Sequence, residues 1–275
     1  MANVSALAQR LNGEDTGSWS TADNREQSGY PSVVIAIASE GECSTLTAMS
    51  IARTMRDYPG LIDIYHAKGT VLPDLRHEIV ANGWTQKTDW ILWVDKELGF
   101  PPFALEWMMN KNERVIGANV TRKTLPPVPA SFVETDDEAG PLYTEVDSEG
   151  KQKVKHLSLH LMLTHMSVFE ELAEDPPIFC FQPYGAGLKT MSDDVYFCQQ
   201  CAKHGIDVFV DHDVSKYCAN IGRYGFSMRD ALMGRNMKKQ MADSDFDFSY
   251  SKEDIAPVVP EPNGEDRDPG LTPYA

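Results

Sequence analysis

Short apolar runs alternate with longer segments of helical spacing between residues 32 and 121, and this order is the strongest constraint on the fold. The runs are rich in Val, Ile and Leu without polar alternation, which predicts strands buried on both faces. Strands are expected at 32–39, 61–67, 89–95 and 114–121, and helices at 44–58, 72–84 and 102–110. This order predicts an α/β fold with a doubly wound, Rossmann-type, mostly parallel sheet flanked by helices.

The second half of the chain is less regular. Residues 126–155 carry Pro, Asp and Lys and predict an inserted loop or hairpin region. A strand running into a helix is expected over 156–174, a loop over 179–191, and a further helix and strand over 192–205 and 206–213.

The two ends of the chain differ in composition from the part between them. Residues 1–28 are polar and rich in Gly, Ser and Asn, which predicts a flexible arm. Residues 243–275 are acidic and Pro-rich, which predicts a disordered tail. The α/β domain is therefore expected over residues 29–242.

The formal net charge of −16 argues against a broad, sequence-independent grip on nucleic acid, which needs a basic surface. Because many of the acids lie in the tail, a local basic groove is compatible with this total. The basic residues around the insertion could form a local strip that contacts phosphates, or they could be ordinary solvated surface charge. They are Lys111, Arg114, Arg122, Lys123, Lys151, Lys153 and Lys155.

The five cysteines are scattered, and only Cys198 and Cys201 form a CxxC pair. This pair lies in a segment of helical spacing with no second pair, which favours two thiols on a helix face over a metal or redox site. No apolar run approaches the roughly 18 residues of a membrane helix, and no secretory signal is evident. A reduced, cytoplasmic compartment is therefore expected, without a membrane partner.

Asp95, Lys96 and Glu97 follow the buried run 91–94 directly. In open α/β sheets, ligands bind outside the carboxyl ends of the strands. Two carboxylates at such an end form either a solvated turn or a site for Mg²⁺ or Mn²⁺, which prefer oxygen ligands and bridge to substrate phosphates. The residues themselves leave both interpretations open.

The segment ILWVDKELGFPPFALEWMMN (91–110) resembles the strand that carries the metal-binding D-x-D of GT-A type glycosyltransferases, in particular the small bacteriophage-encoded ones. Four more segments resemble motifs of that family in the same order: LPDLRHEIV (72–80), RVIGANVTRK (114–123), SDDVYFC (192–198) and DHDVSKYCANIG (211–222). The resemblance runs from about residue 32 to 226. It implies a GT-A-like fold and sugar transfer from a nucleotide-sugar, in the host cytoplasm if the protein is phage-encoded.

The same resemblance implies roles for individual residues. Asp95 would hold the nucleotide ribose or the metal, and Glu97 would ligate the metal, Mn²⁺ or Mg²⁺. Arg76 would contact the nucleotide or its diphosphate. Asp194 would act as general base toward the acceptor hydroxyl, with Asp193 beside it. The expected donor is a UDP-sugar, and the acceptor stays open between a small molecule, a protein, a glycan and a hydroxymethylated DNA base.

The chain departs from the family pattern at several positions. Lys96 stands where the family has a small residue, and it could point away, bind a phosphate, or replace part of the metal's charge. Asn220 stands where the family often has His, and its oxygen suits Mg²⁺. His212 is an alternative ligand or a structural residue. His77 and His160 replace Asn and the usual Gly, so altered donor chemistry or lost activity is expected.

Three functions therefore stay open. The first is a metal-dependent glycosyltransferase. The second is a binding or structural module that keeps the glycosyltransferase fold with weakened catalysis, an alternative that Lys96 and Asn220 favour. The third is a nucleotidyltransferase, which shares the fold and the use of a metal.

Overall fold

The computed structural model describes residues 29–60, 62–124, 126–134, 139–184, 189–222 and 225–243. The expected arm, 1–28, and the tail from residue 244 onward lie outside these ranges. Contacts divide the chain after Asn236, and the fold below is that of the first unit.

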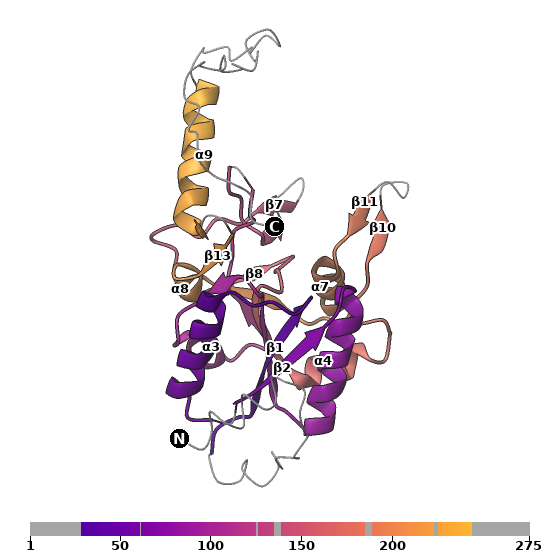
Figure 1. The fold of residues 1–275 in the computed structure, drawn as a ribbon. Coiled ribbons are helices and arrows are strands. Elements are labelled where there is room, and N and C mark those ends of the chain that lie inside the picture. The colour runs from indigo at the N-terminus through magenta and orange to yellow at the C-terminus, as the bar shows by residue number, and fades with distance from the viewer. Residues whose placement is uncertain are drawn as a thin grey trace, which may run out of the picture. The chain divides into compact units, whose positions relative to one another are not determined.

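A seven-stranded sheet forms the centre of this unit, in the order β2-β1-β3-β9-β5-β12-β8 (Figure 1). The pairings give β2, β1, β3, β5 and β12 one direction, whereas β9 and β8 run antiparallel to their neighbours. The strands span Ile62–Lys68, Val33–Ser39, Trp90–Val94, Leu161–His165, Val115–Gly117, Val208–Asp211 and Lys151–Val154 in the sheet order. The expected α/β class with a mostly parallel sheet flanked by helices is confirmed.

The direction of β9 differs from a fully parallel doubly wound order. Its apolar run is buried whichever way it points, so the sequence pattern carries no signal of direction. Its register places Val94 opposite Leu161. The residue that precedes β9, His160, is therefore the neighbour of Asp95 at the end of β3.

Helices cover both faces of the sheet. Alternate residues of β3 pack into two apolar clusters, Ile91 and Trp93 in one and Leu92 and Val94 in the other, because successive side chains of a strand point to opposite faces. Figure 1 shows α3 and α4 on either side of β1 and β2. The helices of this unit are α3 Thr45–Asp57, α4 Leu72–Gln86, α5 Ala104–Asn110, α6 Met166–Leu172, α7 Asp193–Lys203 and α8 His212–Ser215. A further helix, α9 Met228–Asp243, begins in this unit and runs past its end at Asn236.

Three smaller sheets complete the described part of the chain. β4 (Leu98–Gly99), β13 (Ala219–Ile221) and β14 (Gly225–Ser227) form one, and β6 (Phe132–Glu134) pairs with β7 (Ala139–Pro141). The pairing of β6 with β7 confirms the hairpin expected in the inserted region. The loop expected over 179–191 is partly wrong, because β10 (Gln182–Tyr184) pairs there with β11 (Lys189–Met191). Strands of three residues are too short to show a hydrophobic period.

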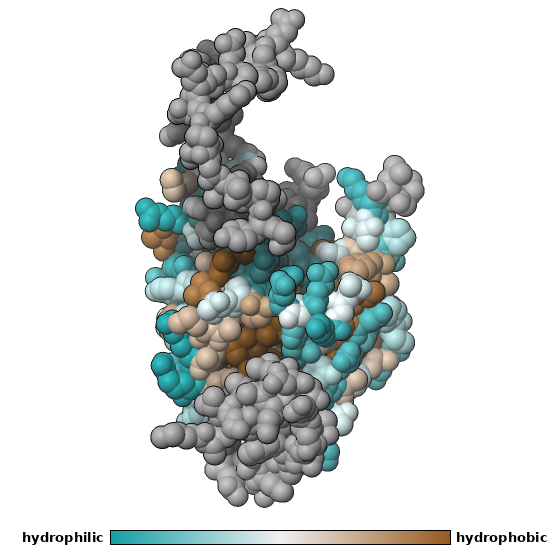
Figure 2. Space-filling model, viewed as in Figure 1, coloured by the Kyte–Doolittle hydropathy of each residue, from teal (hydrophilic) through white to brown (hydrophobic). Residues whose placement is uncertain are grey.

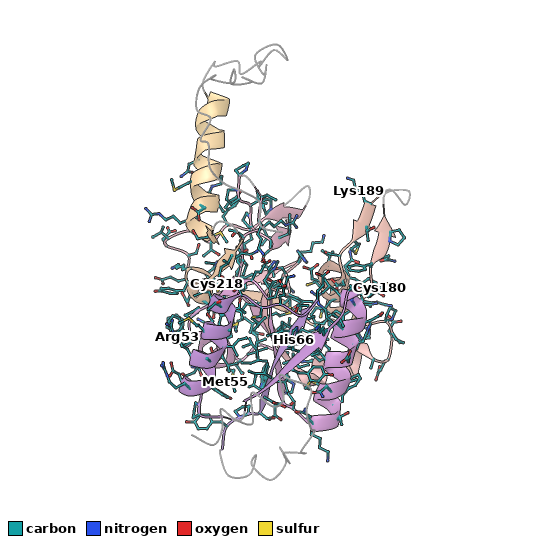
Figure 3. The ribbon with its side chains drawn as sticks, viewed as in Figure 1. Arg53, Met55, His66, Cys180, Lys189 and Cys218 are labelled. Carbon is teal, nitrogen blue, oxygen red and sulfur yellow. The ribbon has the colours of Figure 1, made fainter. Side chains whose placement is uncertain are left out.

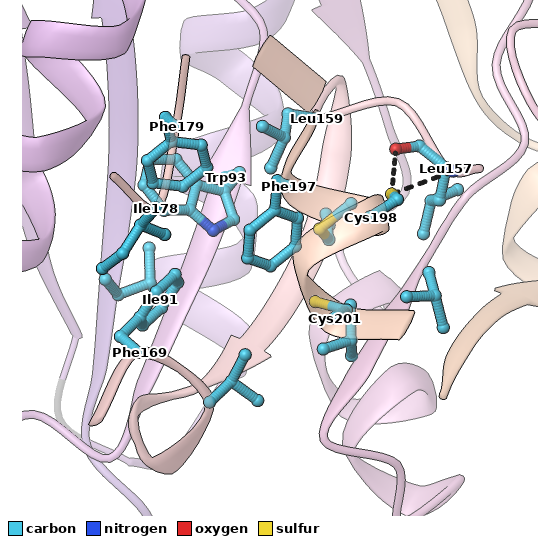
Figure 4. Packing of buried hydrophobic residues seen from close by; sticks show 14 of the residues in the cluster. Ile91, Trp93, Leu157, Leu159, Phe169, Ile178, Phe179, Phe197, Cys198 and Cys201 are labelled. Carbon is cyan, nitrogen blue, oxygen red and sulfur yellow. Dashed lines mark hydrogen bonds between the residues drawn. The ribbon is translucent and has the colours of Figure 1, made fainter. Parts of the chain in front are cut away.

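An aromatic core lies under the first turn of α7 (Figure 4). Phe179 and Phe197 stack with their ring centroids 5.3 Å apart, and Trp93 meets Phe179 edge-on at 5.6 Å. Cys198 and Cys201 are buried in the same cluster, and burial raises the pKa of the Cys198 thiol to about 12. None of the chain's five cysteines forms a disulfide.

The described surface is mixed in character. Figure 2 shows hydrophilic and hydrophobic residues interspersed on one face, and Leu46 and Met49 of α3 are among the exposed apolar side chains. Within the described ranges, no helix combines the length and apolar character needed to cross a membrane.

Candidate functional site

The carboxyl end of β3 is a tight turn fixed by its own aspartate. The Leu98 amide donates to the Asp95 carbonyl at 3.2 Å, and the Glu97 amide donates to the Asp95 carboxylate at 2.9 Å. The Asp95 amide in turn donates to the carbonyl of His160 at 2.8 Å. The sequence therefore placed Asp95 correctly at a strand end, with one carboxylate oxygen engaged by the turn.

Two other elements hold the turn through its backbone. Ser44, the N-cap of α3, donates its amide to the Lys96 carbonyl at 2.7 Å, and the Thr47 hydroxyl donates to the same carbonyl at 3.1 Å. On the other side, the Ile221 amide donates to the Glu97 carbonyl at 2.7 Å. The N-terminus of the 13-residue α3 thus faces the turn and adds partial positive charge there.

The Glu97 carboxylate is paired with a lysine that the sequence did not place in the site. Its Oε2 forms an ion pair with the Nζ of Lys123, and the two side chains are 42% and 30% exposed. Lys123 lies beyond β5, where the Arg122 amide donates to the Val128 carbonyl at 2.8 Å. The carboxylate expected to ligate a metal is therefore occupied by an ammonium group.

Asp193 and Arg76 form a buried ion pair at the start of α7. The Arg76 Nη1 lies 2.5 Å from the Asp193 Oδ2, and the two side chains are only 12% and 4% exposed. Burial raises the pKa of Asp193, and the Arg76 guanidinium opposes that shift without cancelling it. The guanidinium also lies 5.9 Å from the centroid of the Phe179 ring. The motif residues of α4 and α7 thus meet in space.

Asp194 is held next to this pair by three groups. Its Oδ1 accepts hydrogen bonds from the Ser192 hydroxyl and from the Val195 amide, the latter at 2.8 Å, and its Oδ2 lies 3.6 Å from the Nε2 of His156. Burial raises the pKa of Asp194, but His156 and Ser192 together outweigh burial and leave the pKa well below its usual range. Asp194 is therefore a carboxylate at neutral pH.

His160 connects the turn to the start of α7. Its Nδ1 lies 2.8 Å from the Ser158 hydroxyl, which fixes the orientation of the ring. Burial lowers the pKa of His160, the charges of Asp95 and Asp194 raise it, and the charges of Arg76 and Lys123 lower it. Because His160 is hydrogen-bonded to the turn through its carbonyl and lies within reach of the charge of Asp194, we treat the turn and the start of α7 as one candidate site.

His156, His160 and Ser192 were not among the predicted site residues, and Lys123 was considered only for a basic groove around the insertion. His160 left a signal in the sequence, since it replaces a glycine of the family pattern. Its place beside Asp95 depends on the antiparallel pairing of β9 with β3, which the sequence did not indicate.

Two of the expected metal ligands lie in other hydrogen-bonded settings. The buried His212 uses both ring nitrogens, Nδ1 with the Thr144 hydroxyl and Nε2 with the Gln152 side chain, each at 2.9 Å. The Asn220 amide nitrogen donates to the Thr121 carbonyl at 2.9 Å, while its Oδ1 is buried without a hydrogen-bond partner among the described residues.

These residues do not fit a divalent-ion centre as they are arranged. Glu97 is paired with Lys123, and His212 is fully hydrogen-bonded. Within the described ranges, no three His, Cys, Asp or Glu side chains gather as ligands for a metal ion. Dependence on Mn²⁺ or Mg²⁺ stays a prediction.

The basic residues around the insertion are largely neutralised. Lys111 pairs with Asp213, Arg114 with Glu171, Lys151 with Glu113 and Lys153 with Asp207. Arg122 lies over the ring of Phe132. This pairing favours solvated surface charge over a strip that contacts nucleic acid.

A hairpin rises next to the start of α7. Figure 3 shows Cys180 where the chain leaves the core toward β10, and Lys189 on the returning strand β11. Because β11 ends at Met191, two residues before Asp193, this hairpin borders the candidate site along the chain.

No protein-family model and no curated protein sequence matches the chain. Among solved structures, the crystal structure of A197 from STIV is similar, with 15% sequence identity and a TM-score of 0.49. The match covers 72% of this chain and 91% of that one. A likeness at this level carries no argument about activity, so the candidate site stands on its own geometry.

Proposed function

We propose that the protein transfers a sugar from a nucleotide-sugar, with a UDP-sugar as the expected donor, to an acceptor hydroxyl. The observation that carries this proposal is that His160, hydrogen-bonded to Asp95 through its carbonyl at the carboxyl edge of the mostly parallel sheet, also lies within reach of the charge of Asp194. Ligands of open α/β sheets bind at this edge.

Asp194 would accept the proton of the acceptor hydroxyl. The acceptor oxygen forms a bond to the anomeric carbon while the bond from that carbon to the donor's diphosphate breaks. The diphosphate leaves with the electron pair, and the proton passes to Asp194. A carboxylate held by the Ser192 hydroxyl and the Val195 amide would be ionised and fixed in position before the acceptor arrives.

The other residues would orient the substrates. Asp95, at the end of β3, would accept a hydrogen bond from a ribose hydroxyl of the donor. Arg76 is neutralised by Asp193, so its role in nucleotide binding would be to hold Asp193 and the first turn of α7 in place.

The acceptor class is proposed from the charge of the protein. A hydroxymethylated DNA base is one candidate, but the paired basic residues and the net charge of −16 favour a small molecule, a glycan or a protein.

A binding module with weakened catalysis is the second candidate. The observation that favours it is the ion pair of Glu97 with Lys123, which occupies the carboxylate that a catalytic metal would need. Such a module would bind a nucleotide-sugar without consuming it.

The test is turnover of a panel of nucleotide-sugars, followed as release of the nucleoside diphosphate. We expect wild-type protein to release UDP from at least one UDP-sugar, and Asp194→Asn to reduce this rate by about 10²- to 10⁴-fold, the usual contribution of a general base. Asp207→Asn, at the exposed pair with Lys153, is the matched control and should keep the wild-type rate.

Other outcomes separate the alternatives. Saturable binding of a nucleotide-sugar without release would favour the module. Consumption of nucleoside triphosphates instead of nucleotide-sugars would favour a nucleotidyltransferase. Neither binding nor release with any donor would contradict the proposal.

A further inference from the structure

The lysine paired with Glu97 changes what the turn after β3 can bind. Lys123 contributes one ammonium group at Glu97, and Lys96, the residue before Glu97 in the turn, carries a second. Two ammonium groups carry the same formal charge as one divalent ion. The positive charge that a donor's diphosphate requires is therefore already supplied by side chains.

Lys123 is part of the site and not a remote surface residue. Its charge acts on His160, the same imidazole that is affected by Asp95 and Asp194. The segment that carries it is anchored, because the Asn220 side chain donates to the Thr121 carbonyl at 2.9 Å. The amide nitrogen of Asn220 thus holds the segment that leads to Lys123, while ligation of a metal by its oxygen stays a prediction.

Stability alone does not account for the pair of Lys123 and Glu97. Ion pairs between partly exposed side chains contribute little to stability. Because both side chains keep contact with water, the ammonium group can exchange the carboxylate for a phosphate oxygen. Lysine binds phosphate as a compact charge with three rotatable donors, and the N-terminus of α3 at this turn adds to the favourable potential.

We propose that the ammonium groups of Lys123 and Lys96 bind the diphosphate of the donor in place of a divalent metal ion. This inference rests on the proposed function. In the free protein Lys123 pairs with Glu97, and on binding it turns to a phosphate oxygen. The exchange is non-covalent and leaves Glu97 to solvent.

Calorimetric binding of UDP to the full chain, in EDTA and in Mn²⁺, tests this assignment. We expect the same affinity in both conditions. Lys123→Met should weaken binding in EDTA by about tenfold, the scale of one charge-assisted hydrogen bond, and Lys123→Arg should keep most of the affinity. Lys153→Met, which removes a lysine from another exposed ion pair, is the matched control and should have no effect.

Glu97→Gln separates the two accounts by the sign of its effect. If Lys123 binds the diphosphate, removal of its competing carboxylate strengthens UDP binding in EDTA. If Glu97 ligates a metal, the same substitution weakens a binding that needs Mn²⁺. If Lys123→Met folds poorly, the other two variants still test the proposal, because Lys123→Arg keeps the positive charge and Glu97→Gln keeps the size and shape of the side chain.

UDP binding that requires Mn²⁺ and is weakened by Glu97→Gln would overturn this inference and leave the proposed function intact. Metal-independent binding that Lys123→Met does not change would also overturn it. If UDP, GDP, CDP and ADP all fail to bind in either condition, the proposed function itself is wrong and this inference falls with it.

Discussion

Two strands of the central sheet end in nearly the same chemistry but serve different purposes. β3 ends in Asp95, Lys96 and Glu97, and β12 ends in Asp211, His212 and Asp213. The chain that follows decides the difference, since a tight turn follows β3 and a helix follows β12.

The helix after β12 uses its polar residues locally. Asp211 caps α8 by accepting the amides of Asp213 and Val214, at 2.9 and 3.2 Å, and His212 is fixed by two hydrogen bonds. Asp213 pairs with Lys111, next to a surface cavity of about 420 Å³ that also touches Trp107 and Tyr217. An acidic strand end is thus a weak sign of a ligand site until its hydrogen bonds are known.

The buried ion pair of Arg76 with Asp193 should give the largest effect on stability. Arg76→Met leaves Asp193 buried and unpaired, and we expect the free energy of unfolding to fall by about 3–5 kcal/mol. Urea denaturation measures this loss. Arg76→Met combined with Asp193→Leu should recover much of it, and a double variant as unstable as the single one would contradict the pairing.

The end of β12 should matter for stability and not for binding. His212→Ala removes the ring's hydrogen bonds to Thr144 and Gln152 and its buried packing, and we expect a loss of about 2–3 kcal/mol in urea denaturation. UDP affinity per folded molecule should stay at the wild-type value. Loss of UDP binding in a folded His212 variant would make the two strand ends functionally alike.

The end of β3 should show the opposite behaviour. Asp95→Asn keeps an oxygen to accept the Glu97 amide but loses its charge, so the free energy of unfolding should change by less than about 1 kcal/mol. UDP affinity should fall by about tenfold, or about 1.4 kcal/mol, as measured by calorimetry. A large change in stability with unchanged affinity would assign Asp95 to the fold alone.

Acidification should give the smallest effect, through Asp194. Its pKa is lower in the folded protein than the unfolded value of about 4, so its contribution to stability is complete above that value and declines as pH falls below it. The slope from this group is at most about 1.4 kcal/mol per pH unit. Asp194→Asn should flatten the acid limb of stability plotted against pH, and an unchanged limb would contradict the folded-state environment described for Asp194.

The sequence predicted the elements of the fold well where periodicity was strong. The apolar runs that became β1, β3 and β12 and the helical spacing of α3, α4 and α7 were recognised within a few residues. The direction of β9 was not, because strands buried on both faces look alike in either direction.

The candidate site was predicted in its acids and in Arg76 and Lys96, whereas the places of Lys123 and His160 were missed. Asp95 and Asp194 stand out because carboxylates are unusual at the edge of an apolar core. Lys123 and His160 reach the site through the chain beyond β5 and the register of β9 with β3. Both contacts join segments that are far apart in the sequence, so the spacing of residues in one sequence could not predict them.

Amide hydrogen exchange of the full chain, with and without saturating UDP, tests most directly which strand end is the nucleotide site. The account predicts slower exchange at residues 95–98 and 192–195, where the amides of Glu97 and Val195 bond to Asp95 and Asp194, and unchanged exchange at 211–215. Protection confined to residues 211–217, around the cavity beside β12, would contradict it.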